Sequence, residues 1–189
     1  MNSFFSDEEL SQVGFKSVGR NALISRKASF YSPGKISLGN HVRVDDFSIL
    51  SGNITIGNYI HVAAYTALYG GDAGILVDDF ANLSSRVTIY AVSDDYSGAT
   101  MTNPMVPDAY KELIHGLVHI HRHVIIGSGS IVLPGVDIGE GCSIGSLSLI
   151  KNDLPEWMIC AGIPARNFRP REKTLLQLEK EFLGKISST

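Results

Sequence analysis

The chain has 189 residues, 44% hydrophobic and 19% charged, with 16 Lys and Arg against 19 Asp and Glu for a net charge of −3. This length suits one domain with short appendages, and the slightly acidic balance excludes the basic footprint of a nucleic-acid-binding protein. No apolar run is long enough to span a bilayer, and the N-terminus lacks the basic and apolar regions of a secretion signal. We therefore expect a cytoplasmic protein without membrane insertion.

A capping box opens the chain at Ser6-Asp7-Glu8-Glu9 and predicts a short helix that ends near Gly14. Beyond it, an apolar residue returns every sixth position over 38–68, 77–89 and 120–150. An α-helix repeats every 3.6 residues and a strand every 2, so a six-residue repeat is typical of a parallel β-helix. About fifteen hexapeptide units predict roughly five coils.

Small residues often follow four positions after the repeated apolar residue, as at Ser48, Thr66 and Ser130. We expect them to point into tight corners between the flat faces of each coil, with Gly, Asn and Asp supplying the unusual backbone angles there. Cys142 occupies such an inward position, so we expect a buried thiol and not a nucleophile or disulfide partner.

A long insertion at 93–117 interrupts the repeat, and a loop of this length inside a compact repeat is usually functional. Its mixed polar, proline and aromatic content favours an ordered excursion. After Pro170, Leu175, Leu178 and Phe182 share one face of an expected helix that Gly184 ends. The expected division is an N-terminal helix and lead-in at 1–35, the β-helix at 36–168 and a C-terminal helix at 169–189.

Several blocks resemble a known family: Ile126-Gly127-Ser128-Gly129-Ser130, Leu133-Pro134-Gly135-Val136 and Ala161-Gly162-Ile163-Pro164-Ala165. They look like the left-handed β-helix hexapeptide acyltransferases, near the maltose/galactoside O-acetyltransferases and the nucleotide-linked amino-sugar N-acyltransferases. The resemblance implies an all-β, left-handed parallel β-helix and a homotrimer with active sites between subunits. It also implies acetyl-CoA or another short acyl-CoA as co-substrate, lying along the coil.

The same resemblance suggests where the cofactor binds. Small residues would admit the pantetheine arm, Ala161 would line the adenine end, and basic residues late in the chain would meet the phosphates. The alternative is plain corner geometry for the small residues and solvated surface for the basic ones. The candidates are Gly127, Ser128, Gly145, Ser146, Lys151, Ala161 and Arg166, with Arg169 and Arg171 nearby.

Sugar O-acetyltransferases carry a catalytic histidine where the loop leaves the coil, but the corresponding stretch at 89–97 has none. An amine attacks a thioester without a strong base and loses its proton afterwards, so a carboxylate suffices. We expect Asp94 to orient or deprotonate the amine, with Asp95 beside it and Glu140 as a partner from the neighbouring subunit. The alternative is that Asp94 and Asp95 cap a turn.

Substrate-binding candidates flank this stretch. Ser84 and Arg86 could bind sugar hydroxyls or a nucleotide phosphate, Tyr96 could stack on a ring, and His123 could face the acyl groove. His119, His121 and His123 alternate, so we expect them to point to one side together. The sequence shows no acidic or thiol partner for them, so no metal site is expected.

The leading hypothesis is transfer of an acetyl or short acyl group to the amine of a nucleotide-linked amino-deoxy sugar. An example of such an acceptor is dTDP-4-amino-4,6-dideoxyglucose, and the product would serve surface-polysaccharide synthesis. One alternative is a sugar O-acetyltransferase with His115 or His123 as base. Another is a non-catalytic or metal-binding β-helix protein.

Overall fold

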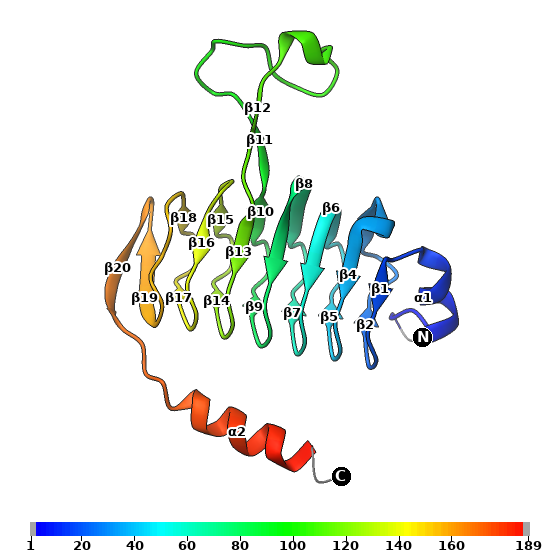
Figure 1. Cartoon of the computed structure of the whole chain (residues 1–189), viewed down its shortest axis with the longest axis vertical. Coiled ribbons are helices and arrows are strands. Elements are labelled where there is room, and N and C mark those ends of the chain that lie inside the picture. The colour runs from blue at the N-terminus through cyan, green and yellow to red at the C-terminus, as the bar shows by residue number, and fades with distance from the viewer. Residues whose placement is uncertain (1–2, 187–189) are drawn as a thin grey trace.

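The computed structural model describes residues 3–186, which wind into a parallel β-helix with three flat faces per coil (Figure 1). The strands of the first face are β1 (Ser17–Val18), β4 (Ile36–Leu38), the second half of β6 (Ile49–Ile56), the second half of β8 (Ala67–Val77), β13 (Val118–Ile120) and β16 (Asp137–Ile138). The second face holds β2 (Leu23–Ile24), β5 (Arg43–Val44), β7 (His61–Val62), β9 (Asn82–Leu83), β14 (Ile125–Ile126), β17 (Ser143–Ile144) and β19 (Met158–Gly162). The third holds β3 (Ser29–Tyr31), the first halves of β6 and β8, β10 (Thr88–Tyr90), β15 (Ile131–Val132) and β18 (Leu149–Ile150). We call the corner between the first and second faces the first corner, the next the second corner, and that between the third and first faces the third corner.

The coil begins earlier than the sequence suggested. Strand β1 pairs with β4 through Val18 and Leu38, and β2 pairs with β5, so the expected lead-in already forms a coil. The described strands of the second face therefore make about seven coils, and the estimate of five was wrong. Val18, Ile24 and Phe30 of this first coil also lie six positions apart. The short 3₁₀ helix η1 (Pro33–Lys35) then lengthens the spacing from Phe30 to Leu38 to eight positions, so the first coil does not continue the six-residue pattern.

The repeated apolar residues stack in columns inside the coil. On the third face, Leu50 pairs with Leu68, Leu68 with Ile89, Ile89 with Val132, and Val132 with Ile150. All five side chains are fully buried. Each coil buries its apolar residues against the next, so the core is continuous from one end of the helix to the other.

The small residues after them occupy the corners as predicted, and their hydroxyls stay hydrogen-bonded. Ser48 Oγ donates to the carbonyl of Ala63 at 3.1 Å, and Thr66 Oγ1 donates to that of Ser84 at 3.1 Å. Ser148 Oγ donates to the carbonyl of Gly145 at 2.7 Å. These bonds satisfy buried polar groups and turn the backbone from one face to the next.

The insertion forms an arm that projects from the coil (Figure 1). Its stem is the antiparallel pair β11 (Val92–Asp94) and β12 (Leu113–His115), and its outer part contains the 3₁₀ helix η2 (Asp108–Tyr110). The arm leaves the third corner after Ala91, whose amide donates to the carbonyl of Tyr69 at 2.9 Å. The excursion is ordered by strand pairing, and its base is fixed to the coil.

The two ends of the chain carry the helices. Helix α1 (Asp7–Val13) has the predicted capping box at Ser6 and ends at Gly14 in the left-handed conformation. Strand β20 (Ala165–Pro170) pairs antiparallel with β19 and leads to α2 (Leu175–Ile186). Gly184 does not end α2, because it keeps a negative φ and the last turn continues to Ile186. Neither described helix is long and apolar enough to cross a membrane.

Candidate functional site

The base of the arm and the third face enclose an open cleft of about 870 Å³. Asp94 and Tyr96 reach it from the arm, and Lys151 reaches it from the end of β18. The remaining lining residues are Tyr90, Val92, Ser93, Ile114, Ile131, Leu133, Pro134, Leu149 and Asn152. Asp94, Tyr96 and Lys151 were all candidate site residues in the sequence analysis. The structure brings them to one cleft although Lys151 lies almost sixty positions after Asp94.

The structure distinguishes the two neighbouring aspartates. Asp94 ends β11 and lines the cleft, and within residues 3–186 its carboxylate accepts one long hydrogen bond, from the amide of Asn103 at 3.4 Å. Asp95 turns into the loop, where its carboxylate accepts from the amide and the hydroxyl of Ser97 at 2.8 Å each. Those bonds lower the pKa of Asp95 and identify it as a loop-capping residue. Asp95 therefore does not belong to the cleft.

The rest of the cleft combines aromatic, apolar and cationic groups. Tyr90 stacks on Tyr69 with ring centroids 5.2 Å apart, and burial raises the pKa of its phenol. Lys151 is exposed, and its ammonium forms no ion pair within residues 3–186. Ile131, Leu133 and Leu149 supply the apolar wall. Such a cleft can hold an apolar chain beside an anion, with Asp94 at its edge.

The small residues proposed to bind the cofactor stack along the second corner with Ser84, one coil above another, whereas Lys151 lines the cleft. The amides of Ser84, Gly127 and Gly145 donate to the carbonyls of Ile126, Ile144 and Cys160 at 3.0, 2.8 and 2.8 Å. The two glycine amides are therefore occupied by the next coil. A Cβ on Gly127 would lie 2.5 Å from the amide nitrogen of Ser146, and one on Gly145 would lie 3.0 Å from Cβ of Ala161. Close stacking accounts for both glycines without a ligand.

Ser84 and Arg86 share this second corner and do not reach the cleft. Arg86 holds φ of +62°, and its guanidinium lies over the ring of Tyr65 at 5.7 Å. Strand β10 separates the corner from the arm, and three extended residues span about 10 Å. Within one chain, Ser84 and Asp94 consequently lie at opposite edges of the third face.

Two further candidates lie elsewhere. Glu140 is in the first corner, where its carbonyl accepts from the amide of Trp157 at 2.8 Å, so the first face separates it from Asp94. Arg166 is an exposed residue of β20, opposite Ala161 in the antiparallel pair. Of the neighbouring arginines, Arg171 donates to the carbonyls of His123 and Gly141 at 2.8 and 2.9 Å. Arg171 thus fastens the C-terminal segment and is not available for a phosphate.

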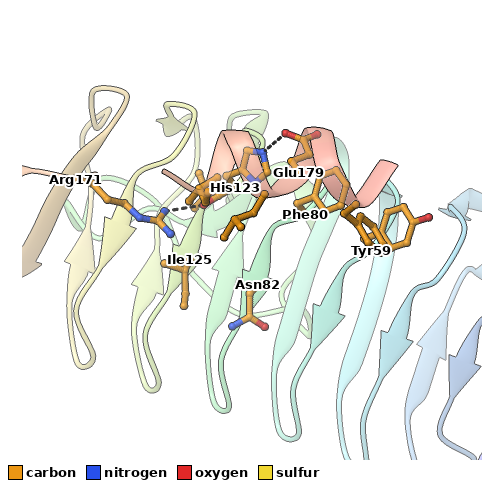
Figure 2. A pocket seen from close by; sticks show the side chains of 11 residues that line it. Tyr59, Phe80, Asn82, His123, Ile125, Arg171 and Glu179 are labelled. Atoms are coloured by element: carbon orange, nitrogen blue, oxygen red, sulfur yellow. Dashed lines mark hydrogen bonds and ion pairs between the residues drawn. The ribbon is translucent and has the colours of Figure 1, made fainter. Parts of the chain in front are cut away.

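His123 does not follow the alternation of His119 and His121. It holds φ of +59° at the first corner, and its ring stacks on Phe80 at 5.2 Å. Figure 2 shows Glu179 of α2 reaching this ring, and the Nε2–Oε2 distance is 2.8 Å. His123 is 8% exposed. The interpretation that it faces the same side as the other two was wrong, because β13 ends at Ile120 and the chain has already begun its turn.

The other histidines add two findings. His115 is exposed on β12 opposite Val92, and it does not line the cleft. His119 and His121 remain side by side and do have acidic neighbours, Asp78 and Asp137, from the coils on either side. The sequence hid these partners because one lies more than forty positions away, across the arm.

The sequence analysis did not identify most of the cleft wall, including Tyr90, Ile131, Leu133 and Leu149. The residues on either side of the inward positions of the repeat could have indicated this wall. Ile131 and Leu133 flank the inward Val132, and Leu149 and Lys151 flank the inward Ile150. Flanking positions of a strand face outward, so apolar residues there mark an outer surface that binds something.

Comparisons with known proteins agree with this architecture. The model of the bacterial transferase hexapeptide family (six repeats) matches residues 117–152. The dTDP-4-amino-4,6-dideoxy-D-glucose acyltransferase of Escherichia coli is 47% identical over 183 residues, which cover 95% of each chain. A galactoside O-acetyltransferase of Lactococcus lactis is 35% identical over 95 residues, which cover 49% of this chain and 42% of that protein.

A solved structure is also similar over almost the whole chain. AntD, an N-acyltransferase from Bacillus cereus in complex with dTDP and 3-hydroxybutyryl-CoA, has a TM-score of 0.97 and 53% identity, covering 99% of this chain and 100% of that one. AntD has also been solved as D94N and S84C mutants, the latter with dTDP-4-amino-4,6-dideoxyglucose and coenzyme A. The same two numbers in this chain are Asp94 and Ser84. The chain therefore belongs to the hexapeptide-repeat acyltransferases, in the family of the E. coli dTDP-4-amino-4,6-dideoxy-D-glucose acyltransferase.

Proposed function

We propose that this enzyme transfers an acetyl or short acyl group from acyl-CoA to the 4-amino group of dTDP-4-amino-4,6-dideoxyglucose, for surface-polysaccharide synthesis. The observation that carries the proposal is the position of Asp94. Asp94 lines the same cleft as Lys151 and the apolar wall, whereas the carboxylate of the neighbouring Asp95 is held by Ser97 of the loop. The kinship with amino-sugar acyltransferases gives the class of acceptor.

Asp94 has a defined task in this chemistry. The amine nitrogen attacks the thioester carbonyl, the C–N bond forms, and the nitrogen becomes strongly acidic. The Asp94 carboxylate accepts the N–H hydrogen bond before attack and takes the proton after it. When the C–S bond breaks, the proton passes to the thiolate of CoA, which leaves as the thiol. Asp94 is thus the catalytic residue, and no histidine is needed.

The cleft also suggests how the co-substrate lies. Ile131, Leu133 and Leu149 form the wall for the pantetheine arm and a short acyl chain, and Lys151 provides a positive charge for a phosphate. The second corner is narrow because it carries small residues, which lets a neighbouring subunit approach. These residues are Gly127, Gly145 and Ala161. Ser128 and Ser146 lie exposed at that corner and can contact the cofactor.

We also propose that the active site forms between copies in a homotrimer. Ser84 and Asp94 lie at opposite edges of one face, so a site that uses both takes them from two subunits. A closed three-fold ring brings the arm of each copy to the second corner of the next. Acyl-CoA and nucleotide sugars are cytoplasmic metabolites, which places the enzyme's work in the cytoplasm.

Acceptor choice tests the proposed function. CoA release from acetyl-CoA and 3-hydroxybutyryl-CoA is measured with dTDP-4-amino-4,6-dideoxyglucose, dTDP-glucose and maltose as acceptors. We expect turnover with the amino sugar alone, and mass spectrometry of the product should show an amide that survives mild alkali. Turnover with dTDP-glucose or maltose, giving an alkali-labile ester, would instead establish an O-acetyltransferase.

Subunit mixing tests the shared site. The variants Asp94→Asn and Ser84→Ala are each expected to be impaired. Co-refolded or co-expressed, they should recover activity, because some interfaces then combine an intact Ser84 with an intact Asp94. Absence of any recovery in mixed oligomers, confirmed by mass, would show that both residues act within one chain.

A further inference from the structure

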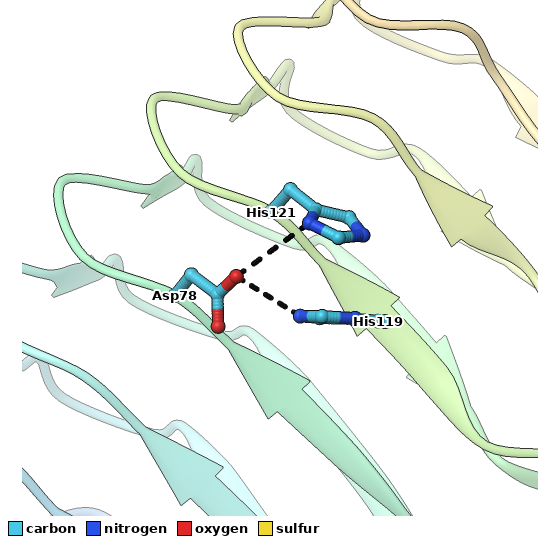
Figure 3. A group of neighbouring side chains, drawn as sticks. All are labelled: Asp78, His119 and His121. Atoms are coloured by element: carbon cyan, nitrogen blue, oxygen red, sulfur yellow. Dashed lines mark hydrogen bonds and ion pairs between the residues drawn. The ribbon is translucent and has the colours of Figure 1, made fainter.

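The strongest unexplained cluster lies on the first face, away from the cleft. Asp78 follows β8; on the next coil, His119 lies on β13 and His121 follows that strand directly (Figure 3). Asp78 Oδ2 is 3.0 Å from His119 Nε2 and 3.6 Å from His121 Nδ1. These three atoms lie within 4.8 Å of one another. On the opposite side of the two rings, Asp137 Oδ2 is 3.1 Å from His121 Nε2 and 3.7 Å from His119 Nδ1.

Hydrogen bonding uses only part of this arrangement. Each neutral ring can donate its Nε2–H, from His119 to Asp78 at 3.0 Å and from His121 to Asp137 at 3.1 Å. The two Nδ1 atoms lie 3.6 and 3.7 Å from the same carboxylates, which is too far for hydrogen bonds. The rings stack with centroids 3.7 Å apart, and His119 Nε2 and His121 Nδ1 both lie beside Asp78.

The same geometry suits a metal ion. If His121 carries its N–H on Nε2, bonded to Asp137, and His119 carries its own on Nδ1, 3.7 Å from Asp137, the lone pairs of His119 Nε2 and His121 Nδ1 converge with Asp78 Oδ2. We propose that Asp78, His119 and His121 bind one divalent transition-metal ion of the Zn²⁺ class, with Asp137 orienting both rings. Two imidazoles and a carboxylate are ligands that zinc prefers, and a carboxylate on the outer ring nitrogen is the usual support of such histidines.

The surroundings suit a cation. The carboxylates of Asp78 and Asp137 give the cluster negative charge, and the nearby Arg122 is engaged by Glu179. The ligand side chains are between 25% and 39% exposed, so an ion can enter from solvent. The expectation of no metal site rested on a missing acidic partner, and Asp78 supplies it.

The position of the ion gives it a structural consequence. Strands β8 and β13 pair directly although the arm lies between them in the sequence. An ion held by Asp78 on one coil and by both histidines on the next joins the coil that precedes the arm to the coil that follows it. The site is separate from the acyl-transfer chemistry, so failure of either proposal leaves the other standing.

The test is zinc binding by the full chain without an affinity tag, stripped with EDTA and desalted. Isothermal titration calorimetry should give one Zn²⁺ per chain, Co²⁺ should show the visible absorption of a low-coordinate site, and Zn²⁺ should raise the melting temperature. His119→Ala and Asp78→Asn should abolish binding, and Asp137→Asn should weaken it by about 10–100-fold. The matched control is His61→Ala, which removes a histidine paired with a single aspartate, Asp45, at 2.7 Å.

Melting temperatures in EDTA establish that each variant is folded, and His121→Asn replaces any variant that is not. The proposal is overturned if the wild type takes up no Zn²⁺. It is also overturned if His119→Ala binds as well as the wild type, or if His61→Ala loses binding equally.

Discussion

A glycine at position 127 can be required either by the close stacking of two coils or by contact with the cofactor. The substitution Gly127→Ala, which adds one methyl group, distinguishes these two explanations. In Gly127→Ala the new Cβ would lie 2.5 Å from the amide nitrogen of Ser146 and 2.8 Å from the carbonyl oxygen of Ile144. Both atoms belong to the backbone of the next coil, which cannot swing aside as a side chain would. Overpacking of this kind costs about 1–3 kcal/mol. A chain of this size loses roughly 2–4 °C in melting temperature per kcal/mol, so we expect a decrease of about 2–12 °C.

Gly184→Ala is the matched control, because a Cβ there meets no atom within 4 Å. It lies in α2, where alanine favours the helix by about 1 kcal/mol over glycine, so its melting temperature should rise slightly. Differential scanning calorimetry of the two variants is followed by KM measurements for acyl-CoA. An unchanged melting temperature with a raised KM in Gly127→Ala would refute the stacking argument and favour contact with the pantetheine arm.

Two further predictions follow from the site and the core. Lys151→Ala should raise the KM for acyl-CoA by about tenfold or more, since a hydrogen bond to a charged group contributes about 1.5–3 kcal/mol, while Lys151→Arg should keep it low and salt should weaken the difference. An unaltered KM in Lys151→Ala would show that Lys151 does not bind a phosphate of the cofactor. Burial raises the pKa of the Cys142 and Cys160 thiols, so the folded protein should not react with a disulfide reagent near neutral pH, whereas the unfolded chain should show both thiols. Rapid reaction of the folded protein would show that the last coils open readily.

The six-residue repeat made most of the fold predictable, because the residues within each hexad determine its strand and its corner locally. Inward residues such as Leu50 and Ile89, and the corner serines, need only their immediate neighbours to take their places. The first coil was missed where η1 breaks the spacing, although its three apolar residues follow the rule. The same locality explains why the capping box at Ser6 was identified correctly.

Corners were predicted less well. The expectation of Gly, Asn and Asp holds at some turns, but Tyr59, Phe80 and His123 hold φ between +57° and +63°. Their rings stack at 5.0 and 5.2 Å, and Phe182 of α2 packs edge-on against Tyr59 and Phe80. Ring stacking between coils offsets the local backbone strain. That compensation depends on residues about twenty or more positions apart, so no single hexad reveals it.

The candidate site was predictable only in part for a similar reason. Asp94 and Tyr96 were selected because they sit on the insertion, and Lys151 because it is a late basic residue. The difference between Asp94 and Asp95 depends on the loop bonds of Ser97, which the sequence does not display. Asp78 could not be matched to His119 without the pairing of β8 and β13 across the arm.

The most direct test of the account is the turnover of Asp94→Asn beside Asp95→Asn with acetyl-CoA and dTDP-4-amino-4,6-dideoxyglucose. Both substitutions keep the size of the side chain, and the amide oxygen of asparagine at 95 can still accept the hydrogen bond from the amide of Ser97. Asp94 accepts the proton in this account, so Asp94→Asn should lower kcat by about 10²–10⁴-fold, the usual contribution of a general base. Asp95→Asn should leave kcat within a few-fold of the wild type. Equal losses in both variants, or full activity in Asp94→Asn, would contradict the central claim.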